Sequence, residues 1–271
     1  MMGGQLSLFD ELFGGSGNKE LPSLEEINNL IDQGAIFYIS HSAGKDSQAM
    51  YAVLKNIVPH DQIVVVHADL GDVEWPGVQD HIKKYTEHEV HIVKANKTFL
   101  QMVEDRGKWP SASYRQCTSD LKRGPIFKFI RNDLKRRKAT IAVNCVGIRA
   151  QESASRGKKD PFSYNKLESC SDRVIRHVYN WYPLFYFSTD EVFDTIRTAG
   201  QEPFWAYKKN ERLSCVFCIM GCVNDLRHGA EQNPDLYRRY VELEKKIGHT
   251  MFMKGSKPIP LEDHVGIKVS A

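Results

Sequence analysis

The residues with the clearest chemical role are those of the segment Ser42-Ala43-Gly44-Lys45-Asp46-Ser47. The segment follows the apolar run 35–40, which predicts a buried strand, and leads into residues 47–57, which are compatible with a helix. A short turn between strand and helix leaves backbone N–H groups at the helix N-terminus, where an anion binds well. The lysine ammonium and the two serine hydroxyls add further donors. The segment therefore predicts a phosphate-binding loop.

This loop differs from the Walker A motif, which places a glycine four residues before Gly-Lys-Ser/Thr. Here Ile39 occupies the position of that glycine, and Asp46 follows the lysine. The simplest alternative is an ordinary strand–helix turn that binds no nucleotide. We favour phosphate binding because strand, turn and helix follow one another in the order that such a loop requires.

The composition is that of a globular protein able to bury a core. The chain has 271 residues, of which 41% are hydrophobic and 26% charged, and its formal net charge is +3. This mild positive charge permits contact with nucleic acid without demonstrating it. No apolar run approaches the roughly 20 residues of a membrane span, and the N-terminus lacks a basic-then-apolar signal pattern. We expect a cytoplasmic protein with no membrane partner.

The order of the expected elements predicts an α/β fold. Strands are expected at 35–40, 62–67, 90–93 and 140–146, and helices at 23–34, 47–57, 76–86, 98–106 and 119–136. This alternation predicts a Rossmann-like parallel sheet with helices on both faces. We divide the chain into a flexible tail over 1–22, an α/β nucleotide-binding domain over 23–200, and a smaller helical region with the cysteine cluster over 201–271.

Ligands of such sheets bind at the carboxyl ends of the strands. The loop 41–46, the segment 67–71 and the loop 147–153 all follow strands and are expected at one edge. Within them, Asp69 could hold Mg²⁺ or a ribose hydroxyl, or could simply cap its loop. Lys122, Arg149 and Arg156 are candidates for binding a triphosphate, since charge on phosphoryl oxygens is stabilised by preplaced cations. For Arg156 a surface role is the alternative.

The six cysteines indicate metal or redox chemistry, because disulfide frameworks are uncommon in cytosolic proteins. Three of them form a Cys-x₂-Cys-x₃-Cys pattern, namely Cys215, Cys218 and Cys222. Closed metal sites usually have four ligands, so a fourth is expected from elsewhere. An all-thiolate site suits a [4Fe–4S] cluster, which we favour, or zinc. The scattered Cys145 and Cys170 are expected to be a core residue and a loop thiol.

Several segments taken together resemble a known enzyme family. The loop 42–47 is similar to the PP-loop, S-x-G-x-D-S, of the adenine nucleotide α-hydrolase-like ATP pyrophosphatases, although Ala43 replaces the usual glycine. The segments that extend the resemblance are 68–71 with 74–76, 115–118 with Lys122 and Pro125, 147–153 with Arg156, 183–184 with 190–193, and 212–218. They are similar to the phosphoadenosine-phosphosulfate (PAPS) reductase branch, in order, over about residues 35–245.

The resemblance implies that ATP is cleaved to AMP and pyrophosphate in the presence of Mg²⁺, with the loop gripping the β,γ-pyrophosphate. It implies catalytic roles for Lys45, Asp46 and Arg149. The residues expected to contact the nucleotide or its Mg²⁺ are Ser42, Gly44, Lys45, Asp46, Ser47, Asp69, Lys122, Arg149 and Arg156.

The resemblance also suggests the fourth metal ligand. In cluster-bearing reductases of this branch a Cys-Cys pair stands in the region of Cys117, and a Cys-x₂-Cys follows far downstream. Here Gln116 replaces the first cysteine of the pair, and Cys222 could supply the missing ligand. The expected metal ligands are thus Cys117, Cys215, Cys218 and Cys222, with His228 as a weaker substitute.

One difference from the PAPS reductases points to another substrate. Those enzymes carry a catalytic cysteine in a C-terminal Glu-Cys-Gly-Leu-His context, whereas this sequence has no cysteine after Cys222. The relatives that fit best are the ATP pyrophosphatases of DNA phosphorothioation systems. They imply adenylylation of a nucleic-acid substrate for sulfur insertion, with DNA and a cysteine desulfurase as partners. The alternatives are a sulfonucleotide reductase-like enzyme helped by a partner's thiol, and a DNA-associated subunit that binds ATP without hydrolysing it.

A short motif lies in the N-terminal tail. The pentapeptide Gln5-Leu6-Ser7-Leu8-Phe9 is similar to the peptide with which bacterial replication and repair proteins dock into the sliding clamp. Its leucines and phenylalanine would fill an apolar groove, and the glutamine would add directed hydrogen bonds. Alternatively, this tail folds back onto its own domain.

Overall fold

The computed structural model describes residues 20–172 and 174–269, which form two compact units. The first unit comprises the described residues up to His67 together with Gln79–Ile92 and Ile126–Pro203. The second comprises Ala68–Val78, Val93–Pro125 and the described residues from Phe204 onward. The predicted clamp-binding segment Gln5–Phe9 lies outside the described residues.

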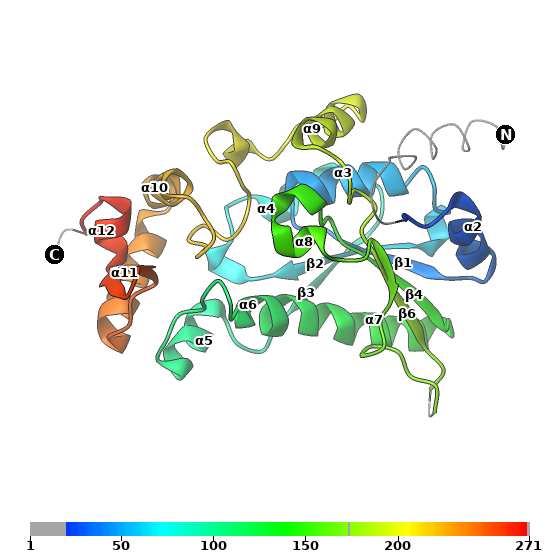
Figure 1. Cartoon of the computed structure of the whole chain (residues 1–271), viewed down its shortest axis with the longest axis horizontal. Helices are drawn as coiled ribbons and strands as arrows, with labels where there is room; N and C mark the ends of the chain where they lie inside the picture. The colour runs from blue at the N-terminus through cyan, green and yellow to red at the C-terminus, as the bar shows by residue number, and fades with distance from the viewer. Residues whose placement is uncertain (1–19, 173, 270–271) are drawn as a thin grey trace. The chain divides into compact units, whose positions relative to one another are not determined.

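The first unit contains a six-stranded sheet with the order β3-β2-β1-β4-β6-β5 (Figure 1). β1 pairs in parallel with β2 and β4, β4 pairs in parallel with β6, and β5 runs antiparallel to β6. The strands are β1 Ile36–Ser40, β2 Ile63–Asp69, β3 Val90–Lys94, β4 Ile141–Cys145, β5 Phe162–Tyr164 and β6 His177–Trp181. The structure confirms the predicted α/β class with a largely parallel sheet.

Helices cover both faces of this sheet, with α3 and α9 on one face and α7 on the other (Figure 1). The helices of this part of the chain are α2 Leu24–Asp32, α3 Lys45–Leu54, α4 Val78–Lys84, α7 Gly124–Arg137, α8 Ala154–Gly157 and α9 Thr189–Thr198, with short 3₁₀ turns at His60–Gln62 and Ala150–Glu152. Every residue of β2 is buried, as expected for a strand packed on both sides. The predicted arrangement of layers is therefore present.

Capping residues fix where two of these helices begin. The Ser23 hydroxyl accepts from the backbone N–H of Glu26 at 3.1 Å, and the Glu26 carboxylate accepts from the Ser23 N–H at 2.8 Å. Ser188 and Glu191 form the same reciprocal capping box on α9. Such a box satisfies two donors that the first helical turn leaves unpaired. The helix expected over 23–34 accordingly begins at Leu24, directly after its cap Ser23.

A buried ion-pair cluster joins α7 to the central strand β1. The Asp133 carboxylate is 4% exposed and accepts from the Tyr38 hydroxyl at 3.0 Å and from the guanidinium groups of Arg136 and Arg137 at 2.5 and 2.8 Å. Burial disfavours the charged carboxylate, but these donors outweigh it and lower the pKa of Asp133 below its ordinary value of 3.8.

We expect this cluster to make folding stability sensitive to acid. Because the folded-state pKa of Asp133 is lowered, its contribution is complete above the unfolded value and is lost as the pH falls through the folded value. Asp133→Asn should lower the free energy of unfolding at pH 7 by about 1–3 kcal/mol and flatten its decline below about pH 4. Urea unfolding at several pH values measures both effects. Asp80→Asn, at an exposed position of α4, is the control, and equal behaviour of the two variants would contradict the expectation.

The second unit is mainly helical. Its elements are α5 Phe99–Arg106, α6 Gln116–Thr118, a π-helical turn Ser119–Arg123, α10 Val223–Gln232, α11 Pro234–Ile247 and α12 Leu261–Val265, with β7 Phe252–Lys254 paired to β8 Lys257–Ile259 and 3₁₀ turns at Gly71–Val73 and Trp205–Lys208. An aromatic cluster lies inside it, with the Tyr240 ring stacked on Trp109 at 5.2 Å and near Phe217 at 5.0 Å. This cluster holds α11 beside the segments that carry the cysteines.

The sheet order locates the edge at which ligands of this fold class bind. β2 and β3 follow β1 in the sequence and lie on one side of it in the sheet, whereas β4 and the later strands lie on the other side. The strand order therefore reverses at β1. In open α/β sheets the ligand crevice lies outside the carboxyl ends of the strands at such a point. The loops that follow β1 and β4 meet there, and they carry the predicted phosphate-binding loop and Arg149.

Among residues 20–172 and 174–269, no helix is both long enough and apolar enough to cross a membrane.

Candidate functional site

The turn after β1 has the geometry of an anion-binding loop. β1 ends at Ser40, Gly44 is the N-cap of α3, and no side chain caps that helix. The first turn of α3 thus presents N–H groups without a capping oxygen, which is the arrangement that attracts an anion. Ala43 has a φ of +59°, a left-handed conformation that glycine adopts without cost and other residues rarely do. The Gly usual at this position in the PP-loop family suits that conformation.

A histidine that the sequence analysis did not select shapes this turn. His41 is 2% exposed, and its Nδ1 accepts from the N–H of Ala43 at 3.1 Å. The backbone N–H of His41 donates to the carbonyl of Val66 at 2.9 Å, which connects the turn to β2. Burial, reinforced by nearby His67 and His81, lowers the pKa of His41 to about 3. The ring is therefore neutral and can act as an acceptor. A histidine directly between a buried strand and a glycine-containing turn was the available sequence signal.

The two serines of the loop bond within it. The Ser47 hydroxyl accepts from the N–H of Ser42 at 3.1 Å and donates to the carbonyl of Gly44 at 2.9 Å. Ser47 is buried, whereas Ser42 is exposed. The loop is thus held in shape by its own hydrogen bonds, and Ser42 is the hydroxyl open to a ligand.

The three predicted catalytic side chains come together. The Asp46 carboxylate lies 2.8 Å from the Lys45 ammonium and 2.6 Å from Nε of Arg149. The Arg149 guanidinium is 3% exposed and also donates to the Phe187 carbonyl at 3.1 Å and to the Thr189 hydroxyl at 3.3 Å. One carboxylate shared by two cations leaves a net charge of +1, which suits a phosphate. In this arrangement Arg149 positions Asp46.

Glu152 links the remaining predicted arginine to this loop. Its carboxylate accepts from the Arg149 backbone N–H at 3.0 Å and pairs with the Arg156 guanidinium. Arg156 is therefore brought next to the loop after β4, through Glu152, and it remains partly exposed.

Gly147 is the point of closest approach between the loops after β1 and β4. A Cβ atom at this position would lie 2.9 Å from the carbonyl carbon of Asp46 and 3.0 Å from its oxygen. These are backbone atoms of the phosphate-binding loop, which cannot turn aside as a flexible side chain would. Only glycine fits, and a glycine directly after a predicted strand is a signal of such an approach.

Gly147→Ala is therefore expected to displace the phosphate-binding loop and lower the free energy of unfolding by about 1–3 kcal/mol, with weaker ATP binding. Urea unfolding and calorimetric titration with ATP measure the two effects. Gly157→Ala is the matched control, because its Cβ would meet its nearest neighbour at an ordinary 3.4 Å. Equal stability of the two variants would contradict the argument.

Asp69 belongs to the second unit, at the end of β2. Its carboxylate lies 2.7 Å from the Lys94 ammonium and accepts from the Gly71 N–H at 2.6 Å. The second contact is the loop cap that the sequence analysis considered. A role in binding Mg²⁺ or a ribose hydroxyl remains a prediction.

Three of the four predicted metal-ligating cysteines interact with one another in the second unit. Burial raises the pKa of the Cys215 thiol to about 12, the Lys122 ammonium acts in the opposite direction, and the charges of Cys218, Glu74 and Cys117 add to the rise. Burial also raises the pKa of Cys117. Lys122 acts to lower this pKa, and Cys218 adds to its rise. We call Cys117, Cys215 and Cys218 the thiol cluster. A metal that bound Cys117 and Cys215 would have to displace their protons.

Lys122 lies beside the thiol cluster. Burial disfavours its charged form, yet the neighbouring Cys215, Glu74 and Cys218 outweigh burial and raise the pKa of this lysine. Its ammonium thus interacts with the sulfur atoms of this cluster, a role that its position in the sequence did not suggest. The predicted contact with a triphosphate is not tested by these interactions.

The remaining cysteines and His228 have other partners. Cys222 is the N-cap of α10, and its sulfur accepts from the Asp225 N–H at 3.5 Å. Cys145 is fully buried in β4. The backbone of Cys170 forms an isolated antiparallel β-bridge with that of Arg176. His228 places Nδ1 2.6 Å from the Asn210 side-chain oxygen.

The thiol cluster contains sulfur atoms, the donors that thiophilic metals prefer, and Lys122 acts on all three of them. A metal site here remains a prediction. Within the described ranges, no three His, Cys, Asp or Glu side chains are already arranged around a common centre. The side chains would have to turn toward a metal on binding it.

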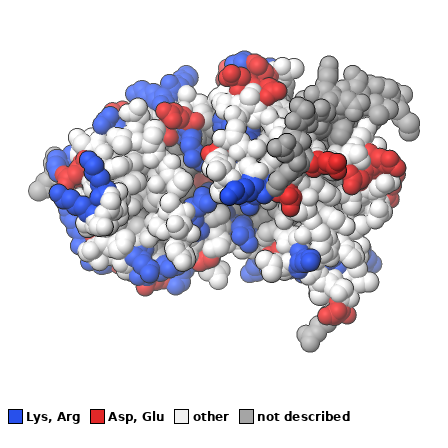
Figure 2. Space-filling model, viewed as in Figure 1, with Lys and Arg blue, Asp and Glu red and all other residues white. Residues whose placement is uncertain are grey.

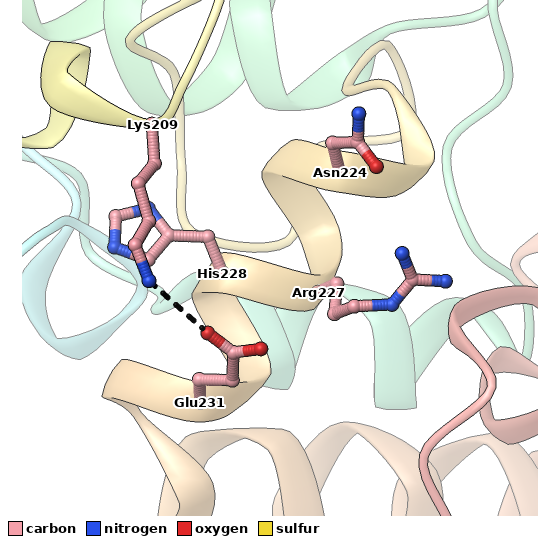
Figure 3. A pocket seen from close by; sticks show the side chains of 5 residues that line it. All are labelled: Lys209, Asn224, Arg227, His228 and Glu231. Carbon is pink, nitrogen blue, oxygen red and sulfur yellow. Dashed lines mark ion pairs between the residues drawn. The ribbon is translucent and has the colours of Figure 1, made fainter.

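A separate pocket of about 260 Å³ lies on α10 in the second unit (Figure 3). Asn224, Arg227, His228 and Glu231 of α10 line it together with Lys209, whose ammonium lies 3.6 Å from Glu231. Burial and the nearby Lys209 lower the pKa of His228, so its ring is mainly neutral at pH 7. Lys209 pairs with Glu231, whereas the Arg227 guanidinium is directed away from this pair and donates to the Val265 carbonyl at 3.3 and 3.2 Å (Figure 3).

Charged residues are mixed on the molecular surface. Figure 2 shows Lys and Arg side chains interspersed with Asp and Glu side chains, with uncharged areas between them. The described part of this face carries no continuous basic surface.

Comparisons with known proteins give one family match and several similar solved structures. The chain matches the family model "Phosphoadenosine phosphosulfate reductase domain" over residues 36–227. It is similar to the crystal structure of phosphoadenylyl-sulfate (PAPS) reductase from Candida auris in a phosphate complex, with 13% identity, 69% of this chain and 91% of that chain covered, and a TM-score of 0.39. It is also similar to Candida glabrata FMN adenylyltransferase in complex with FAD and inorganic pyrophosphate, with 12% identity, coverage of 71% and 65%, and a TM-score of 0.35. A comparison with curated proteins gave no match.

Proposed function

Because the chain belongs to the phosphoadenosine phosphosulfate reductase domain family, we propose that it is an ATP pyrophosphatase that adenylylates a nucleic-acid substrate for sulfur insertion. The observation that carries this proposal is the loop after β1. An uncapped helix N-terminus meets the buried Lys45 and Arg149, and the partly buried Asp46 between them, at the ligand-binding edge of the sheet.

The proposed reaction has two steps. An oxygen of the acceptor phosphate attacks the α-phosphorus of ATP, the bond from that phosphorus to the bridging oxygen breaks, and pyrophosphate leaves with the bonding electrons. Sulfur at the oxidation level of hydrosulfide then attacks the acceptor phosphorus, and AMP leaves with the original oxygen. A cysteine desulfurase with a thiol reductant would supply that sulfur.

The loop residues have distinct proposed tasks. The β- and γ-phosphates would bind to Ser42, Gly44 and Ser47. Lys45 would neutralise the charge that develops on the departing pyrophosphate. Asp46 orients Lys45, and Arg149 holds Asp46. Arg156, which pairs with Glu152, is a further proposed donor to the phosphates at the same edge. Asp69 is the predicted ligand of Mg²⁺, an ion that would neutralise negative charge on the phosphates.

The proposed cofactor is a [4Fe–4S] cluster, with zinc as the second possibility. Cys117, Cys215 and Cys218 would hold it, and Cys222 is the predicted fourth ligand, which would have to give up its capping contact on α10. Such a group supplies electrons or a sulfur-binding metal centre. Lys122 would balance the charge of the thiolates.

DNA is the proposed acceptor, and the predicted peptide Gln5–Phe9 would bring the enzyme to it through a sliding clamp. Two alternatives remain. Family membership favours a sulfonucleotide reductase-like enzyme that uses a partner's thiol. A subunit that binds ATP without turnover is the other.

One experiment separates these functions. Anaerobically purified full-length protein is incubated with Mg²⁺ and ATP labelled at the α- and γ-phosphates, with and without duplex DNA, and in parallel with a sulfonucleotide. We expect AMP and pyrophosphate, formed faster when DNA is present. Formation of ADP would overturn the proposal, sulfite release would select the reductase, and tight ATP binding without cleavage would select the subunit. Iron and zinc are measured in the same samples.

A further inference from the structure

The backbone N–H groups at the start of the turn after β1 are all in use. The N–H of His41 donates to the Val66 carbonyl at 2.9 Å, and that of Ser42 donates to the Ser47 hydroxyl at 3.1 Å. The N–H of Ala43 donates to Nδ1 of the His41 ring at 3.1 Å. A ligand therefore cannot use these three groups without breaking a bond of the turn.

The N–H groups that follow Ala43 are arranged differently. Those of Gly44, Asp46 and Ser47 have no hydrogen-bond partner within residues 20–172 and 174–269. They lie at the N-terminus of α3, where unpaired N–H groups favour an anion. Ala43 is thus the residue at which the chain changes from amides that bond within the protein to amides that an anion could bind.

The backbone of Ala43 carries this change of direction. Its φ of +59° lies in the left-handed region, which disfavours alanine about tenfold (1.4 kcal/mol) relative to glycine. Its side chain is 0% exposed, so the methyl group is packed inside the protein. Without support, the turn would also populate right-handed or extended backbone, in which the N–H of Gly44 points in another direction.

His41 is the residue placed to give that support. Its ring is 2% exposed, and its carbonyl accepts from Nδ1 of the His67 ring at 2.9 Å, so that its backbone is bonded on both sides. Because Nδ1 of His41 accepts from Ala43, its Nε2 carries the proton, and this N–H is buried without a partner in the described part of the chain. The bond to Ala43 is therefore the hydrogen bond that this ring makes there.

We propose that His41 is a positioning residue that takes the place of a glycine's conformational freedom at Ala43. By accepting from the Ala43 N–H, the ring holds the left-handed turn and directs the N–H groups from Gly44 onward toward one phosphate group. The chain gains a packed methyl group and a less flexible unfolded state, and the histidine offsets the conformational cost of the alanine. The link to nucleotide binding rests on the proposed function, whereas the coupling of His41 to Ala43 does not.

The test is a double-mutant cycle of His41→Leu and Ala43→Gly in the full-length protein, with His41→Asn as the conservative variant. Leucine and asparagine have the same branched shape, but only asparagine carries an acceptor on the carbon that bears Nδ1 in histidine. Calorimetric titrations with inorganic pyrophosphate and with ATP and Mg²⁺ measure the affinity of the loop. Urea unfolding without ligand measures the coupling of the two residues in the protein itself.

We expect His41→Leu to bind both ligands about tenfold more weakly than the wild type, because fewer molecules hold the left-handed turn. His41→Asn should bind within about threefold of the wild type. Ala43→Gly should restore the leucine variant to within about threefold as well, because glycine adopts this turn without support. The fall in urea midpoint caused by His41→Leu should likewise be smaller in the Ala43→Gly background. Removing a methyl group would not repair general damage to β1 or α3, so restoration is specific to the turn.

Three results would each overturn the assignment: wild-type affinity of His41→Leu, equal affinities of the leucine and asparagine variants, or no restoration by Ala43→Gly. If His41→Leu does not fold, His41→Ala takes its place in the cycle with the same expectations. Pyrophosphate release from ATP is measured on the wild type in parallel. Coupling of the two residues without release would overturn only the proposed ATP chemistry, and release without coupling would overturn only the role of His41.

Discussion

Replacing Lys45 with alanine is expected to reduce pyrophosphate release from ATP by about 10²–10³-fold, close to background. The Lys45 ammonium is buried at the N-terminus of α3 and is oriented by Asp46 at 2.8 Å. A preplaced cation in such a site stabilises charge on the leaving pyrophosphate without having to reorganise. Quenched-flow assays with labelled ATP give the rate of release, and equilibrium titration separates binding from turnover.

Lys55→Ala is the control on the same helix. Lys55 is the C-cap of α3 and pairs with the exposed Glu87 at 2.5 Å, a surface contact that contributes little to stability. Its variant should keep full activity. Full activity of Lys45→Ala would refute the phosphate-binding role of the loop, and loss of activity in both variants would point to damage of α3 instead.

Replacing Arg149 with alanine is expected to lower the free energy of unfolding by about 3–5 kcal/mol and to abolish tight ATP binding. The change removes the buried partner of Asp46 at 2.6 Å together with the donors to the Phe187 carbonyl and the Thr189 hydroxyl. A partly buried carboxylate would then remain with Lys45 alone. Urea unfolding and ATP titration measure the two losses.

Two further variants define what Arg149 does. Arg149→Lys keeps the positive charge but carries its donors on one nitrogen, which cannot reach all three acceptors that Nε, Nη1 and Nη2 of Arg149 reach separately, so it should recover only part of the stability. Arg156→Ala removes a partly exposed guanidinium that pairs with Glu152, and should cost less than about 1 kcal/mol. If Arg149→Ala proved as stable as Arg156→Ala, the contact of Arg149 with Asp46 would not organise the loop.

Much of the fold could be predicted because its central strands are continuous apolar runs. The predicted strand 35–40 matches β1 Ile36–Ser40, and the predicted helix 98–106 matches α5 Phe99–Arg106. β6 was not predicted, because polar residues such as His177 and Asn180 interrupt its pattern. The expected helix 119–136 begins with a π-helical turn, and regular α-helix starts only at Gly124, beside a proline that suits a helix start.

The site was predictable only where sequence neighbours supply it. The loop 42–47 was found because its donors are consecutive in the chain. The position of Lys122 beside Cys215 depends on segments almost one hundred residues apart, which no local pattern encodes. The guanidinium of Arg149 bonds to Asp46, the Phe187 carbonyl and the Thr189 hydroxyl, and its expected contact with phosphate remains a prediction. That network becomes visible only when the loops after β1 and β4 are placed together.

The neutral imidazole of His41 has a consequence for how nucleotide binding responds to the medium. Because the pKa of His41 is about 3, its ring stays neutral over the pH range of cells and ordinary buffers. Its Nδ1 therefore continues to accept the hydrogen bond from the Ala43 N–H over that range. This bond of the turn thus remains unchanged between weakly acid and weakly alkaline solution. The last proton of a terminal phosphate, in contrast, dissociates near pH 6 in phosphorylated side chains. A change in affinity across that interval would accordingly report the ionisation of the ligand and not a rearrangement of the His41–Ala43 turn.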